Sequence, residues 1–223
     1  MRFLKNPISR IGNLDTIITL PFGDTRYAEA YKKLGWNIDR HNGIDLVPSG
    51  INQECYGSPI YASQDGVVQK VVWEGSTSTK GNGITIEGLP FVENGAKILL
   101  CEVHWHLSDI LVKAGDFVKA GQIIGRMGNS GFTTGSGGFG GTHLHFMVYP
   151  YLIDGGQWKL LYEGNGVNGA DNPLNWLEDN WQKKGQIYQI KKLEQMNMIL
   201  GIIKKTLDWF KKVKVAGLLF IYF

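Results

Sequence analysis

Between residues 58 and 126 the chain alternates short runs of apolar and β-branched residues with glycine-rich turns. Alternation of polarity at every second position is typical of half-buried strands, and no apolar period of helical type runs through this region. We therefore predict an all-β domain. Its short strands are expected at residues 60–62, 66–68, 70–73, 84–86 and 97–106.

The turn residues support the same interpretation. Asn94-Gly95 stands between apolar residues, which is a strong signal for a two-residue β-hairpin. Residues 112–125 form two similar half-turns with a glycine at each corner. Residues 128–141 contain seven glycines and lead directly into another strand-like run, 142–148.

The flanking stretches are less uniform. Residues 14–22 hold a β-branched run that ends at Pro21, so we predict a strand there. Residues 25–35 have the pattern of a short helix that Gly35 ends. Residues 149–182 predict a further hairpin and a closing segment.

The composition changes after residue 182. Residues 183–223 carry nine lysines and two acidic residues, a net charge of +7, whereas residues 1–182 carry 14 basic and 18 acidic residues, a net charge of −4. We therefore predict a domain over 1–182 and a basic C-terminal tail over 183–223. The mildly acidic body disfavours a nucleic-acid-binding protein.

The tail has the period of an amphipathic helix from residue 196 onward. Its apolar stripe consists of Met196, Ile199, Ile203, Leu207, Phe210 and Val213, and lysines occupy the other face. One interpretation is a helix that packs on the domain or on another subunit. A second is peripheral contact of residues 196–223 with a membrane surface, and a third is a truncated or misassigned coding segment. The final apolar run, 215–223, is too short to span a bilayer, which takes about 20 residues.

The five histidines fall into three short clusters, which are His41, then His104 and His106, then His143 and His145. Residues two positions apart on a strand point to the same face. His143 and His145 should therefore lie side by side, with Leu144 and Phe146 turned into the core. The motif has two explanations. One is structural, a polar pair on a sheet surface, and the other is functional, a metal site.

The first cluster has the form His41-x-Gly43-x-Asp45. If this segment is extended, the imidazole and the carboxylate face the same side, and Gly43 leaves room between them for an ion. When this motif is considered alone, a histidine in a turn and a solvated aspartate explain it better than a metal site does. Catalytic zinc commonly has three ligands from histidine and carboxylate and leaves a fourth position for water.

His41, Asp45 and one histidine of the later pair would supply such a set of ligands. Zinc lowers the pKa of its water to about 7 and polarises a substrate carbonyl. The remaining histidine of the pair, if neutral, can accept the proton of that water. His106 is then free to hydrogen-bond the water or the developing oxyanion.

Four motifs occur in one order along the chain, and they are His41-x-Gly43-x-Asp45, His106-Leu107-Ser108, the run 118–131, and His143-Leu144-His145-Phe146. Together they resemble the lysostaphin/LytM-type zinc metallopeptidases over about residues 19–177. The resemblance implies an antiparallel β barrel-sandwich of the duplicated hybrid motif type. With the predicted segments, the fold is this sandwich plus a short N-terminal helix and a C-terminal amphipathic helix.

The resemblance also implies roles. By position, His41, Asp45 and His145 would be the ligands of one zinc ion per chain, and His106 and His143 the two catalytic histidines that do not bind it. The substrate would be bacterial peptidoglycan, cut in its peptide cross-bridges or stem peptides. Some members of the family have lost their ligands and regulate other hydrolases, whereas this chain keeps all of them.

One position departs from the family pattern. The family often has tyrosine two residues before the histidine of His-Leu-Ser, and this chain has His104 there. We expect His104 to share a face with His106 and to line the wall of the cleft. Cys101, at odd spacing from both, should face away from them as a core thiol. Two cysteines, Cys55 and Cys101, do not make a disulfide framework, and the sequence leaves their pairing open.

These features predict a zinc-dependent endopeptidase that acts on the cell wall, outside the cell or in the periplasm. No apolar run of signal-peptide length opens the chain, which favours a phage-encoded lytic or virion-associated enzyme. One alternative is a zinc-containing module that binds the wall or regulates hydrolases without cleaving. Another is a carrier protein, because the hairpin at 115–121 also occurs in biotinyl and sugar-phosphotransfer domains. The cleaved bond and the oligomeric state stay open.

Overall fold

The computed structural model describes residues 4–8, 16–48, 55–74, 79–134 and 140–178. All of them fall within one compact unit, Met1–Gln182. The predicted basic tail and its amphipathic helix lie outside the described residues, so the division into a domain and a tail stays a prediction. Among the described residues, no helix has the length and apolar character needed to cross a membrane.

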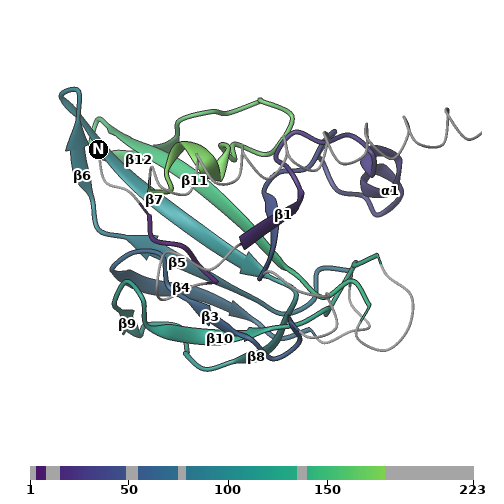
Figure 1. Ribbon diagram of the computed structural model, residues 1–223. Coiled ribbons are helices and arrows are strands. Elements are labelled where there is room, and N and C mark those ends of the chain that lie inside the picture. The colour runs from purple at the N-terminus through teal and green to yellow at the C-terminus, as the bar shows by residue number, and fades with distance from the viewer. Residues whose placement is uncertain (1–3, 9–15, 49–54, 75–78, 135–139, 179–223) are drawn as a thin grey trace, which may run out of the picture. The chain divides into compact units, whose positions relative to one another are not determined.

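The described residues form two antiparallel sheets that face each other (Figure 1). The strands of the larger sheet are β1 (Thr16–Leu20), β2 (Ile44–Pro48), β4 (Gly66–Val72), β5 (Gly83–Gly88), β6 (Phe91–Glu93), β7 (Ala96–Trp105), β9 (Phe117–Val118), β11 (Leu144–Asp154) and β12 (Gln157–Leu160). Their order is β1-β2-β11-β7-β5-β4-β9, with β12 beside β11 and β6 beside β7. The smaller sheet consists of β3 (Pro59–Tyr61), β10 (Ile123–Met127) and β8 (Leu107–Ile110), in that order.

This arrangement confirms the predicted all-β domain. Asn94 and Gly95 connect β6 to β7 with φ angles of 50° and 80°, which are the left-handed values that a tight hairpin turn requires. The predicted helix at 25–35 is present but shorter, as α1 (Ala28–Lys33). A short 3-10 helix, η2 (Pro173–Asn175), follows β12.

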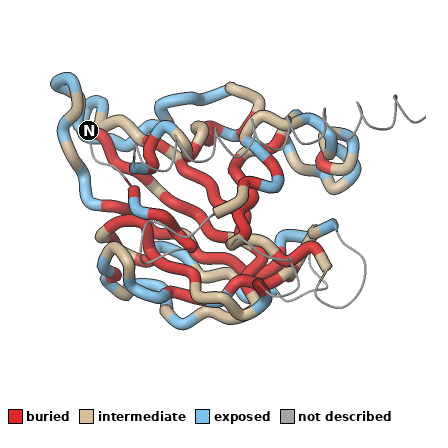
Figure 2. The backbone as a smooth tube through the Cα atoms, in the orientation of Figure 1, coloured by how far each residue is buried: buried red, intermediate tan, exposed pale blue. Residues whose placement is uncertain are grey.

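The hydrophobic core lies between the two sheets. Leu144, Phe146 and Val148 of β11 are fully buried in it, as are Leu100 of β7 and Ile124 of β10. Figure 2 shows β7 and β11 as buried along most of their length. Burying one large apolar side chain contributes about 1.5–3 kcal/mol, so these central strands hold the fold together. Because side chains alternate, every second residue of β11 faces away from this core.

The two cysteines are free thiols in the structure. Cys55 is buried in the core. Cys101 is only half-buried on the outer face of β7, so the prediction that it is a core thiol was wrong. Its environment still raises the pKa of the thiol to about 12, chiefly because of desolvation.

Candidate metal centre

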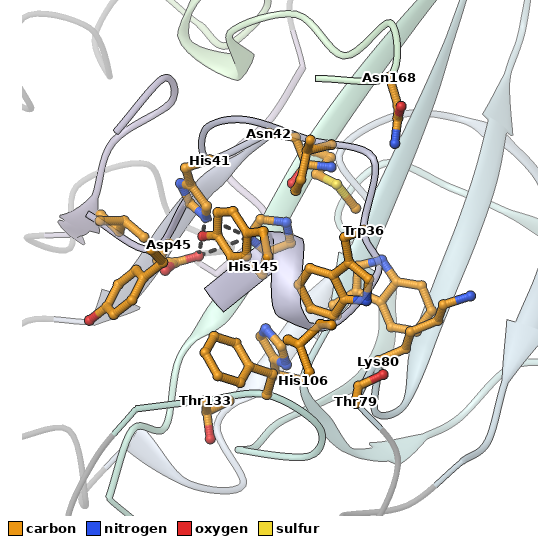
Figure 3. Close-up of a pocket in the computed structure, with 18 of the residues that line it drawn as sticks. Trp36, His41, Asn42, Asp45, Thr79, Lys80, His106, Thr133, His145 and Asn168 are labelled. Atoms are coloured by element: carbon orange, nitrogen blue, oxygen red, sulfur yellow. Dashed lines mark hydrogen bonds and ion pairs between the residues drawn. The ribbon is translucent and has the colours of Figure 1, made fainter. Parts of the chain in front are cut away.

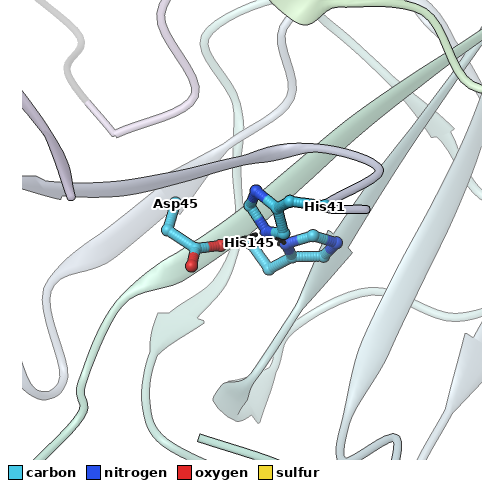
Figure 4. Close-up of side chains that lie close together, drawn as sticks. All are labelled: His41, Asp45 and His145. Carbon is cyan, nitrogen blue, oxygen red and sulfur yellow. Dashed lines mark hydrogen bonds and ion pairs between the residues drawn. The ribbon is translucent and has the colours of Figure 1, made fainter. Parts of the chain in front are cut away.

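Three of the predicted residues come together on the outer face of the larger sheet (Figure 4). Asp45 of β2 and His145 of β11 are direct cross-strand partners, and His41 lies on the turn that leads into β2. All three side chains are buried, and their ligand atoms lie within 4.8 Å of one another. The pairing of two strands that are distant in sequence thus creates the cluster.

The donor atoms have distances that suit a zinc ion. His145 Nδ1 is 2.9 Å from both His41 Nε2 and Asp45 Oδ1, and His41 Nε2 is 3.1 Å from Asp45 Oδ1. Tetrahedral zinc with bonds of about 2.0–2.1 Å places such donors about 3.3 Å apart. The three atoms need to separate by only a few tenths of an ångström to hold the ion, so this set of two imidazoles and one carboxylate fits it.

The first histidine is held in one tautomer. His41 Nδ1 lies 3.0 Å from the carbonyl oxygen of Pro21, to which it donates a hydrogen bond. Nε2 then carries the lone pair and points to the centre. A backbone or carboxylate partner of this kind orients histidine ligands in many metal sites.

His106 and His143 lie beside this centre. His143 Nε2 is 3.5 Å from Asp45 Oδ1, and the ring of His106 is 4.7 Å from that of His143 and 5.8 Å from that of His145. Each ring donates its Nδ1 proton to a carbonyl oxygen, from His106 to Ser130 at 2.7 Å and from His143 to Gly141 at 2.6 Å. In the neutral form both rings therefore have an unprotonated Nε2.

Burial shifts the pKa values of His106, His145 and Asp45 and so affects their charges. It holds the pKa of His106 well below 6.5, with repulsion from His143 and His145 acting in the same direction. Burial also lowers the pKa of His145 to about 4, although its hydrogen bond with Asp45 acts against the shift. For Asp45, burial raises the pKa, but the charge of His143 and the interactions with His145 and His41 outweigh it, so the carboxyl stays ionised.

A hydrogen-bond network supports the carbonyl that orients His106. The Asn82 backbone N–H donates to Ser130 Oγ at 2.9 Å, and Ser130 Oγ and Asn82 Nδ2 donate to the Leu107 carbonyl at 2.8 and 3.0 Å. The two loops also touch backbone to backbone, since a Cβ atom on Gly81 would lie 2.4 Å from the Ser130 carbonyl oxygen. Sequence patterns gave no role to Asn82 or Ser130, because the contact between these loops is tertiary.

The role predicted for Gly43 was wrong. A Cβ atom there would lie 2.5 Å from the Phe146 carbonyl oxygen and 2.9 Å from His145 Cε1. The missing side chain therefore makes room for β11 and the ring of a ligand candidate, and not for an ion.

The predicted position of His104 was also wrong. His104 is fully buried on the core face of β7, with its ring 5.2 Å from that of Phe146. The predicted strand 97–106 ends at Trp105, and His106 takes a left-handed φ of 68° at the corner into β8. Because this corner interrupts the alternation, Trp105 and His106 both line the outer pocket while His104 enters the core.

A pocket of about 570 Å³ opens above the metal centre (Figure 3). One wall is aromatic: Tyr31 stacks on Trp36 at 5.6 Å, and Phe132 meets the rings of Trp36 and Tyr27 edge-on at 6.1 and 6.4 Å. These contacts join the segment around α1 to the loop after β10. Another part of the lining is polar and uncharged, with Asn42, Tyr149 and Asn168. None of these lining residues was predicted, although Tyr149 shares the face of His145 by strand alternation.

Comparison with known proteins gives a consistent result. The model of peptidase family M23 matches residues 39–158. Lysostaphin of Staphylococcus simulans is 36% identical over 191 residues, which cover 83% of this chain and 34% of the relative. Peptidoglycan DD-endopeptidase ShyA of Vibrio cholerae is 36% identical over 159 residues, which cover 70% of this chain and 29% of the relative.

Among solved structures, the catalytic domain of the antimicrobial peptidase lysostaphin from Staphylococcus simulans is 27% identical with a TM-score of 0.45. The match covers 73% of this chain and 91% of that domain. This chain spans about a third of the length of the full lysostaphin relative.

Proposed function

The chain belongs to peptidase family M23, and we propose that it is a zinc-dependent endopeptidase that hydrolyses peptide bonds of bacterial peptidoglycan. The observation that carries the proposal is the convergence of His41, Asp45 and His145 at the floor of a pocket, with two further histidines beside them. The names of the relatives support the substrate class, because they include a peptidoglycan DD-endopeptidase and a glycyl-glycine endopeptidase.

In this proposal His41, Asp45 and His145 hold the zinc ion. When bound, the ion supplies a water with a pKa near 7 and polarises the carbonyl of the scissile bond. The low pKa of His145 keeps its ring neutral at pH 7, so the ring does not have to lose the extra proton of an imidazolium before it binds the ion.

His106 and His143 are the proposed catalytic residues. His143 accepts the proton of the attacking water at Nε2, which faces the centre because Nδ1 is bonded to the Gly141 carbonyl. His106 presents the same atom from the corner between the sheets, where it accepts a hydrogen bond from the water. While His143 carries that proton, its Nε2–H group hydrogen-bonds the developing oxyanion. The proton then passes to the amine nitrogen as the C–N bond breaks.

The experiment uses purified sacculi, with the released fragments identified by mass spectrometry. We expect the zinc-loaded chain to release peptide fragments, and His145→Ala to lose both bound zinc and fragment release. His106→Ala should keep its zinc but lose fragment release, which separates metal binding from proton transfer. Removal of zinc by a chelator should abolish the wild-type activity, and added zinc should restore it.

Two outcomes contradict the proposal in different ways. Fragment release by the zinc-free protein excludes the mechanism. Bound zinc without any released fragment excludes the enzyme and favours the alternative, a zinc-containing module that binds the wall or regulates hydrolases. The phage or virion origin, the cell-wall location and a peripheral membrane contact of residues 196–223 stay predictions.

A further inference from the structure

The pocket extends from the metal centre along the outer face of β11. His145, Met147 and Tyr149 are successive residues on this face, and all three line the same cavity. A strand rises about 3.3 Å per residue, so the backbone positions of His145 and Tyr149 are about 13 Å apart. An extended peptide rises at the same rate. A substrate with its scissile bond over the centre would therefore reach Tyr149 with a residue about three or four positions away.

Among the described residues, the hydroxyl of Tyr149 has only weak hydrogen bonds. Its oxygen accepts from Asn42 Nδ2 at 3.4 Å, and its proton is directed at the sulfur of Met147, also at 3.4 Å. A distance of 3.4 Å is long for an amide donor, and a thioether is a weak acceptor. A half-buried hydroxyl that gives its proton to sulfur would gain from a carbonyl oxygen placed in the pocket.

The surroundings select a neutral acceptor. Burial raises the pKa of Tyr149 to about 12, so the hydroxyl keeps its proton at any working pH. Apart from the histidines, the charged side chains among the described residues that line the pocket are Asp45 of the metal centre and Lys80. Figure 3 places Lys80 beside Thr79, away from Asn42. The environment of Tyr149 thus offers hydrogen bonds without a formal charge, as a peptide backbone requires.

We propose that Tyr149 and Asn42 form a subsite for a main-chain carbonyl oxygen of an extended peptide substrate, about three or four residues from the bond that is cut. The inference rests on the proposed endopeptidase function and adds where the substrate is held. Tyr149 donates its proton to the carbonyl, and Asn42 supports the phenol oxygen from the turn that also carries His41. The subsite favours long peptides over short ones.

The test compares two synthetic peptides around the bond that the enzyme cuts in sacculi. The long peptide has four residues on each side of the bond, and the short one has a single residue on each side with blocked ends. Tyr149→Phe should raise KM for the long peptide about three- to tenfold, the effect of one lost hydrogen bond, with kcat close to wild type. For the short peptide, KM and kcat should be unchanged.

Tyr151→Phe is the matched control. It makes the same chemical change two residues further along the same face of β11, at a tyrosine that does not line the pocket. Both of its kinetic constants should be those of the wild type for either peptide. An unchanged KM of Tyr149→Phe for the long peptide overturns the subsite, as does an equal loss on both peptides.

Calorimetry with soluble peptidoglycan fragments gives a readout that needs no turnover. If the wild type releases nothing from sacculi, the proposed function fails, and weaker binding of the fragments by Tyr149→Phe than by Tyr151→Phe still supports the subsite. Equal binding by the two variants overturns it.

Discussion

Two clusters of histidine and carboxylate lie on opposite faces of the same sheet. On the outer face, His41, Asp45 and His145 bring three ligand atoms together at the floor of a pocket. On the inner face, His104 and Glu102 of β7 are both fully buried in the core, with His104 Nε2 at 3.4 Å from Glu102 Oε1. The residue types are the same, and the surroundings differ.

The difference lies in what completes each cluster. The ligand atoms of the outer cluster converge on one point, and the second nitrogen of His41 is bonded to backbone. In the inner cluster Glu102 Oε1 accepts from the Ser63 backbone N–H at 3.0 Å, but Glu102 Oε2 and both nitrogens of His104 have no hydrogen bond within the described part of the chain. An outer set of three donors beside a cavity can hold an ion. The inner pair is fully buried and has polar atoms without hydrogen bonds among the described residues, so we expect it to affect stability.

The largest effect should come from Asp45. Asp45→Asn keeps the shape of the side chain but removes the charge that attracts a cation. Changes to outer partners of metal sites cost about 10- to 100-fold, so loss of a ligand should cost more than about 1,000-fold in cell-wall hydrolysis. Hydrolysis and zinc content should fall together, while near-ultraviolet circular dichroism stays that of the wild type. Asp154→Asn, an exposed carboxylate on β11, is the control and should change neither.

Changes to Glu102 and His104 should alter stability, whereas the change at Asp45 alters hydrolysis and zinc content. Glu102→Ala leaves His104 buried without its partner, and we expect the free energy of unfolding to fall by about 3 kcal/mol. The double variant Glu102→Leu with His104→Leu replaces both groups by apolar side chains, so its stability should return to within about 1 kcal/mol of the wild type or exceed it. Urea unfolding measures both.

Activity then separates the two faces. Because neither Glu102 nor His104 lines the pocket, kcat/KM per folded molecule should be unchanged in the double variant. A tenfold loss of kcat/KM with full zinc content would contradict the distinction and give the inner pair a part in the reaction.

Strand alternation was enough to predict which residues of β11 enter the core. Leu144 and Phe146 are fully buried on the inner face, and His145 lies on the outer one. The hairpin at Asn94-Gly95 was equally predictable, because few residues accept the backbone conformation that it needs. The candidate ligands came from the clustering of the histidines and the donors that zinc commonly takes, and the choice between His143 and His145 came from the family resemblance.

What could not be predicted depends on tertiary contacts. His104 and His106 face opposite sides because the chain turns at His106 with a left-handed φ, and no local pattern signals this corner. Gly43 is small because β11 passes close to it, and that contact exists only once β2 and β11 pair. Asn42 and the aromatic wall around Trp36 likewise join segments that are distant in sequence.

The last prediction concerns the pH dependence that the outer cluster gives to stability. In the metal-free protein the pKa of His145 is about 4, against 6.5 in an unfolded chain. Between these values the unfolded state binds more protons, so the free energy of unfolding falls as the pH falls from 6.5 toward 4, by up to about 3 kcal/mol in total. His106 acts in the same direction, and Asp45 adds a further loss only below pH 3.8.

Urea unfolding at pH 7, 6 and 5 measures the slope of the unfolding free energy with pH. His145→Gln should lose a large part of it. An equal slope in His145→Gln and the wild type would show that the outer cluster does not control acid sensitivity.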